Sequence, residues 1–315
     1  MAKILVTGGA GFIGSHVVDQ LIEKGHSVTV IDDLSSGLRE NLPIGVTLHE
    51  LDVRLPEARV AIRKTQPDVI VHMAAQISVR VSMEDPGFDT AVNVGGVVNI
   101  LQAANDCKQS GGRLPHIVFI STGGAIYGEQ EAFPATEDHP IRPESVYGLA
   151  KRVGEMYLEL WSRQFGLTYC ALRLSNVYGP RQNPHGEAGV VAIFCERLLR
   201  GELPTINGTG EQTRDFIYVE DVARAVLAAA TKRTEGVFNI GTAREVSVNQ
   251  VYSAIAAGLE MPVDAPHGPV KGGEQQRSCI DPGRAFADLG WDPQVGLADG
   301  LARTAVWFKI KSSAR

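Results

Sequence analysis

Residues 6–14 of this 315-residue chain, VTGGAGFIG, carry the pattern that most strongly indicates its fold. Gly8, Gly11 and Gly14 follow a short apolar run and stand at the start of a helical pattern over residues 12–24. Glycines at this spacing allow a tight turn, a close approach of the backbone to a pyrophosphate, and tight packing of the helix on the strand. The free N–H groups and the positive end of the helix then attract phosphates. The alternative is a purely structural turn, which the strand before and the helix after make the weaker interpretation.

An acidic pair, Asp32 and Asp33, follows about twenty residues later in VTVIDDLSSG, as the dinucleotide fingerprint requires. A carboxylate here accepts hydrogen bonds from the adenosine ribose hydroxyls and repels a 2′-phosphate, which favours NAD over NADP. The register of the strand favours Asp32, and Asp33 is a solvated neighbour or shares the role. The loop lacks the lysine of a nucleotide-hydrolysing P-loop.

Short apolar runs alternate with longer amphipathic segments through the first half of the chain. This is the βαβ rhythm of a parallel sheet that is covered on both faces. It predicts an α/β fold with a doubly wound parallel sheet of the Rossmann type. The expected strands cover residues 3–8, 27–32, 46–53, 68–75, 116–122 and 167–174, and the expected helices cover 12–24, 55–64, 86–108 and 145–165.

After residue 173 the sequence becomes rich in Gly, Pro and Asn, which is typical of segments that cover a ligand. We therefore expect a cofactor domain formed by residues 1–174 and 219–246, and a smaller C-terminal substrate-binding subdomain formed by residues 175–218 and 247–315. Further helices are expected over 190–200, 219–231, 248–259, 283–289 and 297–310, with a strand over 237–241.

Composition limits the possible partners. The net charge is −6 and no Lys/Arg-rich run occurs, so we expect no nucleic-acid partner. The four cysteines lie far apart without metal-ligand spacing, which predicts no metal site and a reducing environment. The N-terminus does not resemble a signal peptide and no stretch approaches ~18 consecutive apolar residues, so we expect a cytoplasmic protein without a membrane partner.

Tyr147 and Lys151 lie four residues apart in SVYGLAKRVGE, so a helix places them on one face. The alternative is an ordinary exposed pair. The expected helix follows the fifth strand, near the carboxyl ends of the strands, where open parallel sheets bind ligands. An adjacent ammonium and a positively charged nicotinamide both favour the phenolate, so Tyr147 is a candidate general base.

These residues resemble those of the extended short-chain dehydrogenase/reductases, and specifically of the nucleotide-sugar epimerases. The resemblance covers nearly the whole chain. It is carried by TGGAGFIG (7–14), DDLSSG (32–37), LDVR (51–54), VHMAA (71–75), STGGAIYG (121–128), YGLAK (147–151), RLSNVYGPRQ (173–182), GTGEQTRDFIYVEDVARA (208–225), FNIG (238–241) and RSCIDPGRA (277–285).

The resemblance implies 4-epimerisation of a UDP-hexose, with UDP-glucose and UDP-galactose as the expected pair and their N-acetyl forms as further candidates. Tyr147 would take the proton of the C4 hydroxyl, the hydride would pass to bound NAD, and the 4-keto sugar would turn over before the hydride returns. The implied cofactor residues are Gly8, Gly11, Phe12, Ile13, Gly14, Asp32, Asp33, Asp52, Val53, Ala74, Ala75, Gln76, Asn93 and Lys151. The implied substrate residues are Thr122, Tyr147, Asn176, Arg181, Val190, Gln212, Arg214, Arg277 and Ser278.

The chain departs from the family pattern in STGGAIYG. Many relatives carry the catalytic hydroxyl four residues before the tyrosine of this motif, where this chain has Gly123. We expect Thr122 to supply that hydroxyl, with Ser121 in reserve; alternatively, both hydroxyls satisfy backbone groups. The family's 4,6-dehydratases carry an Asp-Glu pair where this chain has Gly124 and Ala125, so dehydration is disfavoured.

Other readings stay open at this point. Arg181 could hold a carboxylate, which keeps epimerases and decarboxylases of UDP-glucuronate as alternatives. A net oxidoreductase that makes a deoxy-sugar and a non-catalytic NAD-binding regulator are the others. Ser278 lies just after Arg277, in the neighbourhood where some relatives have a large aromatic residue, which suggests room for an N-acetyl group. The family also implies a homodimer built from the helices over 86–108 and 145–165, with Val97, Ile100, Leu101, Met156, Leu160 and Trp161 as the apolar side chains that face a partner or their own sheet.

Overall fold

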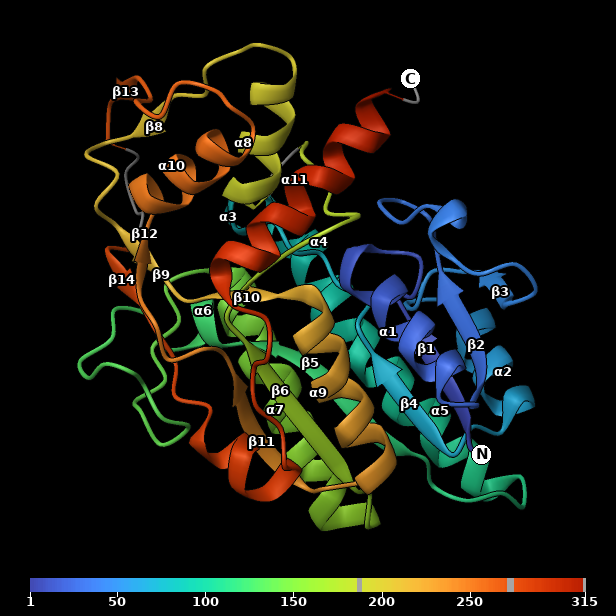
Figure 1. The fold of residues 1–315 in the computed structure, drawn as a ribbon. Helices are drawn as coiled ribbons and strands as arrows, with labels where there is room; N and C mark the ends of the chain where they lie inside the picture. The colour runs from blue at the N-terminus through green and yellow to red at the C-terminus, as the bar shows by residue number, and fades with distance from the viewer. Residues whose placement is uncertain (186–188, 271–274, 314–315) are drawn as a thin grey trace.

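A parallel sheet of seven strands forms the centre of the computed structural model, which describes residues 1–185, 189–270 and 275–313 (Figure 1). The strand order is β11-β6-β5-β4-β1-β2-β3, and every neighbouring pair is parallel. The order reverses direction at β1, which creates a crevice at the carboxyl ends of β1 and β4. The strands are β1 (Lys3–Thr7), β2 (Ser27–Asp32), β3 (Thr47–Glu50), β4 (Val69–His72), β5 (His116–Thr122), β6 (Tyr169–Leu174) and β11 (Gly236–Ile240).

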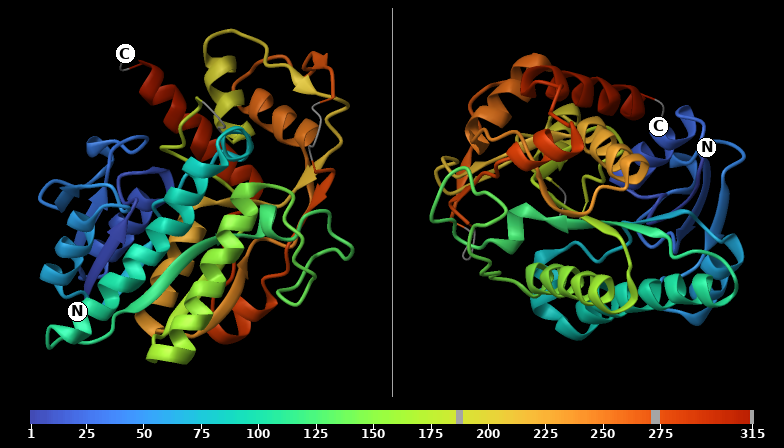
Figure 2. Two further views of the ribbon diagram at one scale, coloured as in Figure 1. Left: turned by 180° about the vertical axis from the view of Figure 1, so that it is seen from behind. Right: turned by 90° about the horizontal axis from the view of Figure 1, so that it is seen from below.

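Helices cover both faces of the sheet, as Figure 2 shows from behind and from below. One face carries α1 (Phe12–Glu23) and α9 (Val219–Lys232), and the other carries α2 (Pro56–Thr65), α5 (Gly96–Gln109) and α7 (Val146–Phe165). Every residue of β4 and β5 is buried. Because both faces are covered, the central strands read as continuous apolar runs, and this confirms the predicted doubly wound α/β fold.

The helix expected over residues 86–108 contains a π-helical turn. It consists of α4 (Pro86–Thr90), the π-helical turn Ala91–Gly95 and α5. No local pattern in the sequence predicts this turn, because Asn93 at its centre is fixed by hydrogen bonds with Gln76, 17 residues earlier. Such turns are frequent at functional sites.

The remaining elements build a second, smaller hydrophobic core above the sheet in Figure 1. Its helices are α8 (Val190–Leu199), α10 (Val248–Gly258) and α11 (Leu297–Ser313). Its short strands are β7 (Asn176–Tyr178), β8 (Ile206–Asn207), β9 (Thr213–Arg214), β10 (Phe216–Tyr218), β12 (Val246–Ser247), β13 (His267–Gly268) and β14 (Arg277–Ser278), and two short helices, α3 (Val79–Glu84) and α6 (Gly123–Ile126), border the sheet. Strands of two or three residues have no detectable period, so the sequence could not predict them.

The two cores are not divided cleanly along the chain. Ala285, Leu289 and Trp291 lie in the C-terminal part of the sequence but are buried in the core that α1 and α9 form on the sheet. The segment expected to be helical over 283–289 is π-helical over Ala285–Leu289, and it packs on α9. None of the described helices combines the length and apolar character needed to cross a bilayer.

Candidate functional site

The glycine loop lies at the carboxyl end of β1, between β1 and α1. Gly8 has a φ of 71°, and a β-carbon there would stand 2.7 Å from the backbone nitrogen of Ala74. A β-carbon at Gly14 would overlap the carbonyl oxygen of Gly8. Gly11 is the N-cap residue of α1 and, having no side chain, leaves the first N–H groups of the helix uncapped by a side chain. Side chains at these positions would therefore fill the space inside the loop. The backbone N–H donors there fit a pyrophosphate.

Asp32 is 6 % exposed, and its carboxylate lies under this loop. It accepts hydrogen bonds from the backbone N–H of Ala10 at 2.9 Å and of Leu34 at 2.9 Å. Burial raises the pKa of Asp32 above its usual range. A carboxylate can accept about four hydrogen bonds, so acceptor capacity remains for ribose hydroxyls. Asp33, in contrast, is exposed and binds the backbone and hydroxyl of Ser35.

A threonine and a histidine that the sequence analysis did not single out shape the floor of the crevice. Thr7 Oγ1 accepts from the backbone N–H groups of Met73 and Ala74, both at 3.2 Å, and lies 2.8 Å from His72 Nδ1. Burial, with Lys151 nearby, lowers the pKa of His72 to about 3, so the imidazole is neutral and Nδ1 accepts the threonine proton. The motif VHMAA contains this histidine, and its place at the end of a buried strand was the available signal.

Two predicted cofactor residues, Gln76 and Asn93, hold each other in place. Asn93 Oδ1 accepts from the Gln76 backbone N–H at 3.1 Å, and Asn93 Nδ2 donates to the Gln76 carbonyl at 2.8 Å. Both side-chain amides also donate to the buried carboxylate of Asp89, which no sequence motif marked.

Asp52 and Val53 follow β3, near α4 and α5. Asp52 accepts two hydrogen bonds from Arg54 Nε, at 2.8 and 3.0 Å, and this contact lowers the pKa of the Asp52 carboxyl. Val53 is 5 % exposed and lies against Gly96, where a β-carbon would come within 3.1 Å of it. The Arg54 guanidinium in turn lies 5.5 Å from the ring centroid of Phe88.

Tyr147 and Lys151 lie in the first two turns of α7, as their spacing predicts. Lys151 Nζ donates to the Ile120 carbonyl at 2.9 Å and stands 5.8 Å from the ring centroid of Tyr147. Ser145 caps the helix by accepting from the Gly148 N–H at 3.1 Å. A β-carbon at Gly148 would come within 2.5 Å of the Ala125 carbonyl oxygen, so a glycine is needed where α6 meets α7.

The protonation of the pair differs from the expectation at the sequence level. Burial lowers the pKa of Lys151 to about 8. Burial raises the pKa of Tyr147 above its ordinary value, and the charge of Asp89 raises it further. The expected lowering of the tyrosine pKa therefore does not arise from the protein alone, because the ammonium does not outweigh burial. Lowering the Tyr147 pKa therefore also requires the positive charge of a nicotinamide.

The two candidate hydroxyls have different surroundings. Ser121 is 2 % exposed and donates to Glu155 Oε1 at 2.6 Å, so its hydroxyl is committed to a buried ionic cluster. Thr122 is the N-cap of α6, and its Oγ1 accepts from the Ala125 N–H at 3.2 Å. This contact uses Thr122 as an acceptor and leaves its proton for another partner. Thr122 is therefore still the better candidate for the catalytic hydroxyl. Its oxygen also caps the backbone of α6, as the alternative expectation proposed.

The buried ionic cluster lies beneath α6, where β5 and β6 meet α7. Arg173 binds Glu155 through Nε at 2.9 Å and Nη2 at 2.7 Å, and its Nη1 donates to the Tyr127 hydroxyl at 2.9 Å. Tyr127 donates to Asn239 Oδ1 on β11 at 2.7 Å. Both hydrogen bonds of the Tyr127 hydroxyl are therefore made inside the protein, to Arg173 and Asn239.

A cavity of about 370 Å³ opens in the smaller core, beside the carboxyl end of the sheet. Its wall includes four of the predicted substrate residues, namely Asn176, Val190, Gln212 and Arg214. Ser278 is buried on β14 in register with Arg214 on β9. A β-carbon at Gly124 would face the Asn176 side chain at 3.7 Å, which links this cavity to the end of β5.

The two other predicted arginines do not line this cavity. Arg277 donates to Glu245 Oε1 at 2.9 Å, and its guanidinium stacks 3.8 Å from the ring centroid of Phe133. Arg181 forms a 2.7 Å ion pair with Asp19 of α1. Their roles toward a substrate stay predictions, since each guanidinium already binds a carboxylate in the structure.

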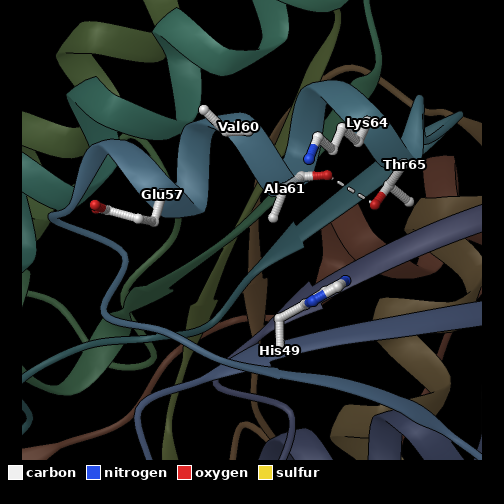
Figure 3. A pocket seen from close by; sticks show the side chains of 6 residues that line it. All are labelled: His49, Glu57, Val60, Ala61, Lys64 and Thr65. Atoms are coloured by element: carbon white, nitrogen blue, oxygen red, sulfur yellow. Dashed lines mark hydrogen bonds between the residues drawn. The ribbon is translucent and has the colours of Figure 1, made fainter.

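A second hollow, of about 310 Å³, lies at the far edge of the sheet between β3 and α2 (Figure 3). None of the predicted site residues lines it. Its lining residues are His49, Glu57, Val60, Ala61, Lys64 and Thr65, and the one hydrogen bond drawn there, from Thr65 Oγ1 to the Ala61 carbonyl, lies within α2. No group of three or more potential metal ligands occurs in the part of the chain that the structure describes.

The arrangement combines three chemical capacities at the carboxyl ends of the strands. The glycine loop and Asp32 fit a dinucleotide, Tyr147 and Lys151 form an acid/base pair, and the cavity around Asn176 is open to a second ligand. Such a set can remove a proton from a substrate hydroxyl while a dinucleotide accepts the hydride.

Comparison with known proteins agrees with this arrangement. The model of the NAD dependent epimerase/dehydratase family matches residues 4–241. The chain is 44% identical to a putative UDP-glucose 4-epimerase of Methanocaldococcus jannaschii over 97% of this chain and 98% of that protein. It superposes on the UDP-glucose 4-epimerase of Thermotoga maritima, solved with UDP-glucose, with a TM-score of 0.93 and 44% identity, covering 98% of this chain and 99% of the other. The complex of the Thermus thermophilus UDP-glucose 4-epimerase with NAD gives a TM-score of 0.90 at 43% identity, with the same coverage.

Proposed function

The chain belongs to the NAD dependent epimerase/dehydratase family, and we propose that within it this protein is a UDP-glucose 4-epimerase that interconverts UDP-glucose and UDP-galactose. The observation that carries the proposal is the position of Tyr147 and Lys151. Both lie in the first two turns of α7, where Lys151 Nζ is held by the Ile120 carbonyl of β5 and stands 5.8 Å from the Tyr147 ring centroid.

Each part of the chain has a defined task in this reaction. Tyr147 removes the proton of the C4 hydroxyl and returns it after the sugar has turned, while Thr122 donates a hydrogen bond at the same oxygen. Lys151, held by the Ile120 carbonyl, supplies positive charge beside the tyrosine. The chemistry that bound NAD would supply is acceptance of the hydride from the sugar and its later return. Arg214 and Asn176, in the cavity wall, bind the diphosphate and the sugar.

The test is proton NMR of UDP-galactose with purified protein and no added cofactor. We expect the anomeric signal of UDP-glucose to grow to a constant ratio, because NAD is regenerated in each cycle. If neither added NAD nor UDP-glucose as the starting sugar gives conversion, the proposal is wrong.

The N-acetyl forms are a finer part of the proposal. Ser278 is small and lies in register with Arg214, which supports space for an N-acetyl group on the sugar. The same NMR assay with UDP-N-acetylglucosamine should then show conversion. Turnover of UDP-glucose without turnover of its N-acetyl analogue would contradict this part alone.

The ion pair of Arg181 with Asp19 bears on the alternative reactions of UDP-glucuronate. These reactions required a cation for the substrate carboxylate, and the arginine considered for this role already has a carboxylate partner. The non-catalytic regulator is disfavoured because such a protein has no use for Tyr147 and Lys151 together.

We further propose a division into a cofactor domain (1–174 and 219–246) and a substrate-binding subdomain (175–218 and 247–315), with the exception of the 285–291 segment that packs on the sheet. A cytoplasmic location is supported by four free cysteine thiols, all of them buried.

A homodimer through α7 and its neighbours completes the proposal. Leu149, Met156 and Leu160 are between 39% and 53% exposed on α7, and Met83 and Phe88 are exposed on the adjoining short helices. Val97, Ile100 and Leu101 are instead buried against the sheet, so they do not face a partner. Light scattering of the wild-type protein should give twice the chain mass, and the Met156→Lys variant should give the monomer mass. A monomeric wild-type protein would contradict the proposed dimer.

A further inference from the structure

A buried carboxylate that no motif marked stands behind the cofactor residues. Asp89 of α4 is fully buried, with an exposed fraction of 0%. Its Oδ2 accepts from Gln76 Nε2 at 2.7 Å and from Asn93 Nδ2 at 2.9 Å. Its Oδ1 has no hydrogen-bond partner among the described residues. A buried carboxylate oxygen without a partner is costly, so it calls for an explanation.

The charge of Asp89 acts on both members of the catalytic pair. α4 and the π-helical turn pack on α7, and the Asp89 charge raises the pKa of Tyr147 and that of Lys151. For Lys151 it opposes burial, which lowers the pKa to about 8. The Asp89 charge thus acts on the pair across the packing of α4 on α7, while its two hydrogen bonds go to amides.

The other charged groups that face Lys151 are already committed. Glu155, one turn further along α7, binds Arg173, Arg152 and the Ser121 hydroxyl. His72, from β4, is neutral in its hydrogen bond to Thr7. Asp89 is thus the carboxylate near Lys151 whose charge is not already neutralised by an arginine in the described structure.

We propose that Asp89 is a positioning residue for the catalytic pair: its buried carboxylate fixes Gln76 and Asn93 through one oxygen and places a negative charge where α4 packs on α7, the helix that carries Tyr147 and Lys151. The residue touches the amides, not the substrate, and it acts through Lys151. The π-helical turn lies where this helix packs on α7, and its central residue, Asn93, binds Asp89 four residues earlier.

The proposal makes a definite electrostatic prediction. Removing a negative charge that opposes burial lowers the pKa of Lys151 further, so less of the residue is charged at neutral pH. One charge at close range shifts a pKa by roughly one unit or more. Asp89→Asn keeps the shape of the side chain and a carbonyl oxygen for the two amides, and removes only the charge.

The first experiment observes Lys151 directly and does not depend on the proposed activity. The protein is labelled with carbon-13 at the lysine ε-carbon, and the Lys151 signal is identified by its loss in Lys151→Arg. We expect this signal to titrate about one pH unit lower in Asp89→Asn than in wild type. Glu84→Gln, a carboxylate-to-amide change on a side chain that is 59% exposed, should leave it unchanged. An unshifted Lys151 titration in Asp89→Asn would overturn the proposal.

The second experiment rests on the proposed function. The alkaline limb of kcat for UDP-galactose should move down by the same amount in Asp89→Asn, with KM little changed. A residue with only a structural role would lower the melting temperature without moving this limb. Asp89→Ser, which also removes the charge, provides the same two readouts should Asp89→Asn not fold. Absence of epimerase activity in wild type, together with the expected NMR shift, would refute the proposed function and leave the role of Asp89 standing.

Discussion

Gly14 lies against Gly8 so closely that a β-carbon on Gly14 would overlap the Gly8 carbonyl oxygen. The first turn of α1 and the end of β1 therefore pack so closely that there is room only for the hydrogen atoms of glycine. This contact fixes the direction in which the first N–H groups of α1 point.

Gly14→Ala should abolish the retention of NAD, because backbone atoms on both sides of the loop must move apart. We expect loss of co-purifying NAD, measured by the absorbance of the protein after denaturation, and a lower melting temperature. Gly258→Ala in α10, where a β-carbon would meet nothing within 4 Å, is the matched control. Normal NAD content in Gly14→Ala would show that the loop does not hold the pyrophosphate.

Tyr147→Phe should lower kcat by roughly 10²- to 10⁴-fold, the usual contribution of a general base. NAD retention should stay normal, since the ring that faces Lys151 is kept. A coupled assay for UDP-glucose formation gives kcat, and NAD content gives the control. A variant that keeps more than a tenth of wild-type activity would assign the proton transfer to another group.

Val190→Phe should raise the KM for the sugar nucleotide about tenfold with little change in NAD content, because Val190 lines the cavity of about 370 Å³ in the smaller core. Val263→Phe enlarges a side chain that is 49% exposed and serves as the control. If both variants leave KM unchanged, the substrate binds outside this cavity.

Arg173→Met should destabilise the protein by about 3 kcal/mol, since it leaves Glu155 buried with one arginine partner fewer. Urea unfolding measures this difference. Arg39→Met, which breaks the exposed pair with Glu50, should cost less than about 1 kcal/mol. Equal effects of the two changes would mean that the buried cluster adds nothing specific.

Lys151→Met should make the NAD-free protein more stable at neutral pH while abolishing activity. The pKa of Lys151 is lowered to about 8, so below that pH the folded protein bears the cost of a buried ammonium. This cost is up to about 3 kcal/mol on the scale of 1.36 kcal/mol per pKa unit. It declines as the pH rises from about 8 to the lysine's ordinary value of 10.5, so the gain in melting temperature should shrink over that window. A gain in melting temperature that is the same at all pH values would contradict the lowered pKa of Lys151.

The sequence predicted those parts of the protein in which local pattern and packing agree. Apolar and β-branched runs predicted β1 to β6, and the glycine spacing predicted the loop. The central strands are apolar throughout because they lie between two layers of helices, whereas β3 at the edge of the sheet is only partly buried. The spacing of Tyr147 and Lys151 placed them correctly on one helix.

The parts that depend on contacts between distant segments were not predictable. Ser121 and Thr122 are neighbours with similar side chains, and only the presence of Glu155 on α7 separates their surroundings. Arg181 was considered for a substrate group, and a residue of α1, Asp19, turned out to be its partner. Asp89 lies in no sequence motif, and only its burial in the folded structure marks it as important.

The hydrogen bond from Tyr127 to Asn239 has a consequence for synthesis of the protein. A chain that leaves the ribosome in order exposes the glycine loop, Tyr147 and Arg173 well before Asn239, and the final strand of the sheet arrives with that residue. Until then Tyr127 and Arg173 lack the neighbour that completes their cluster, and one edge of β6 is unpaired. The nascent protein therefore carries Tyr147 and Arg173 beside an open-edged sheet until β11 has been made, and it is in this interval that a chaperone would protect it best.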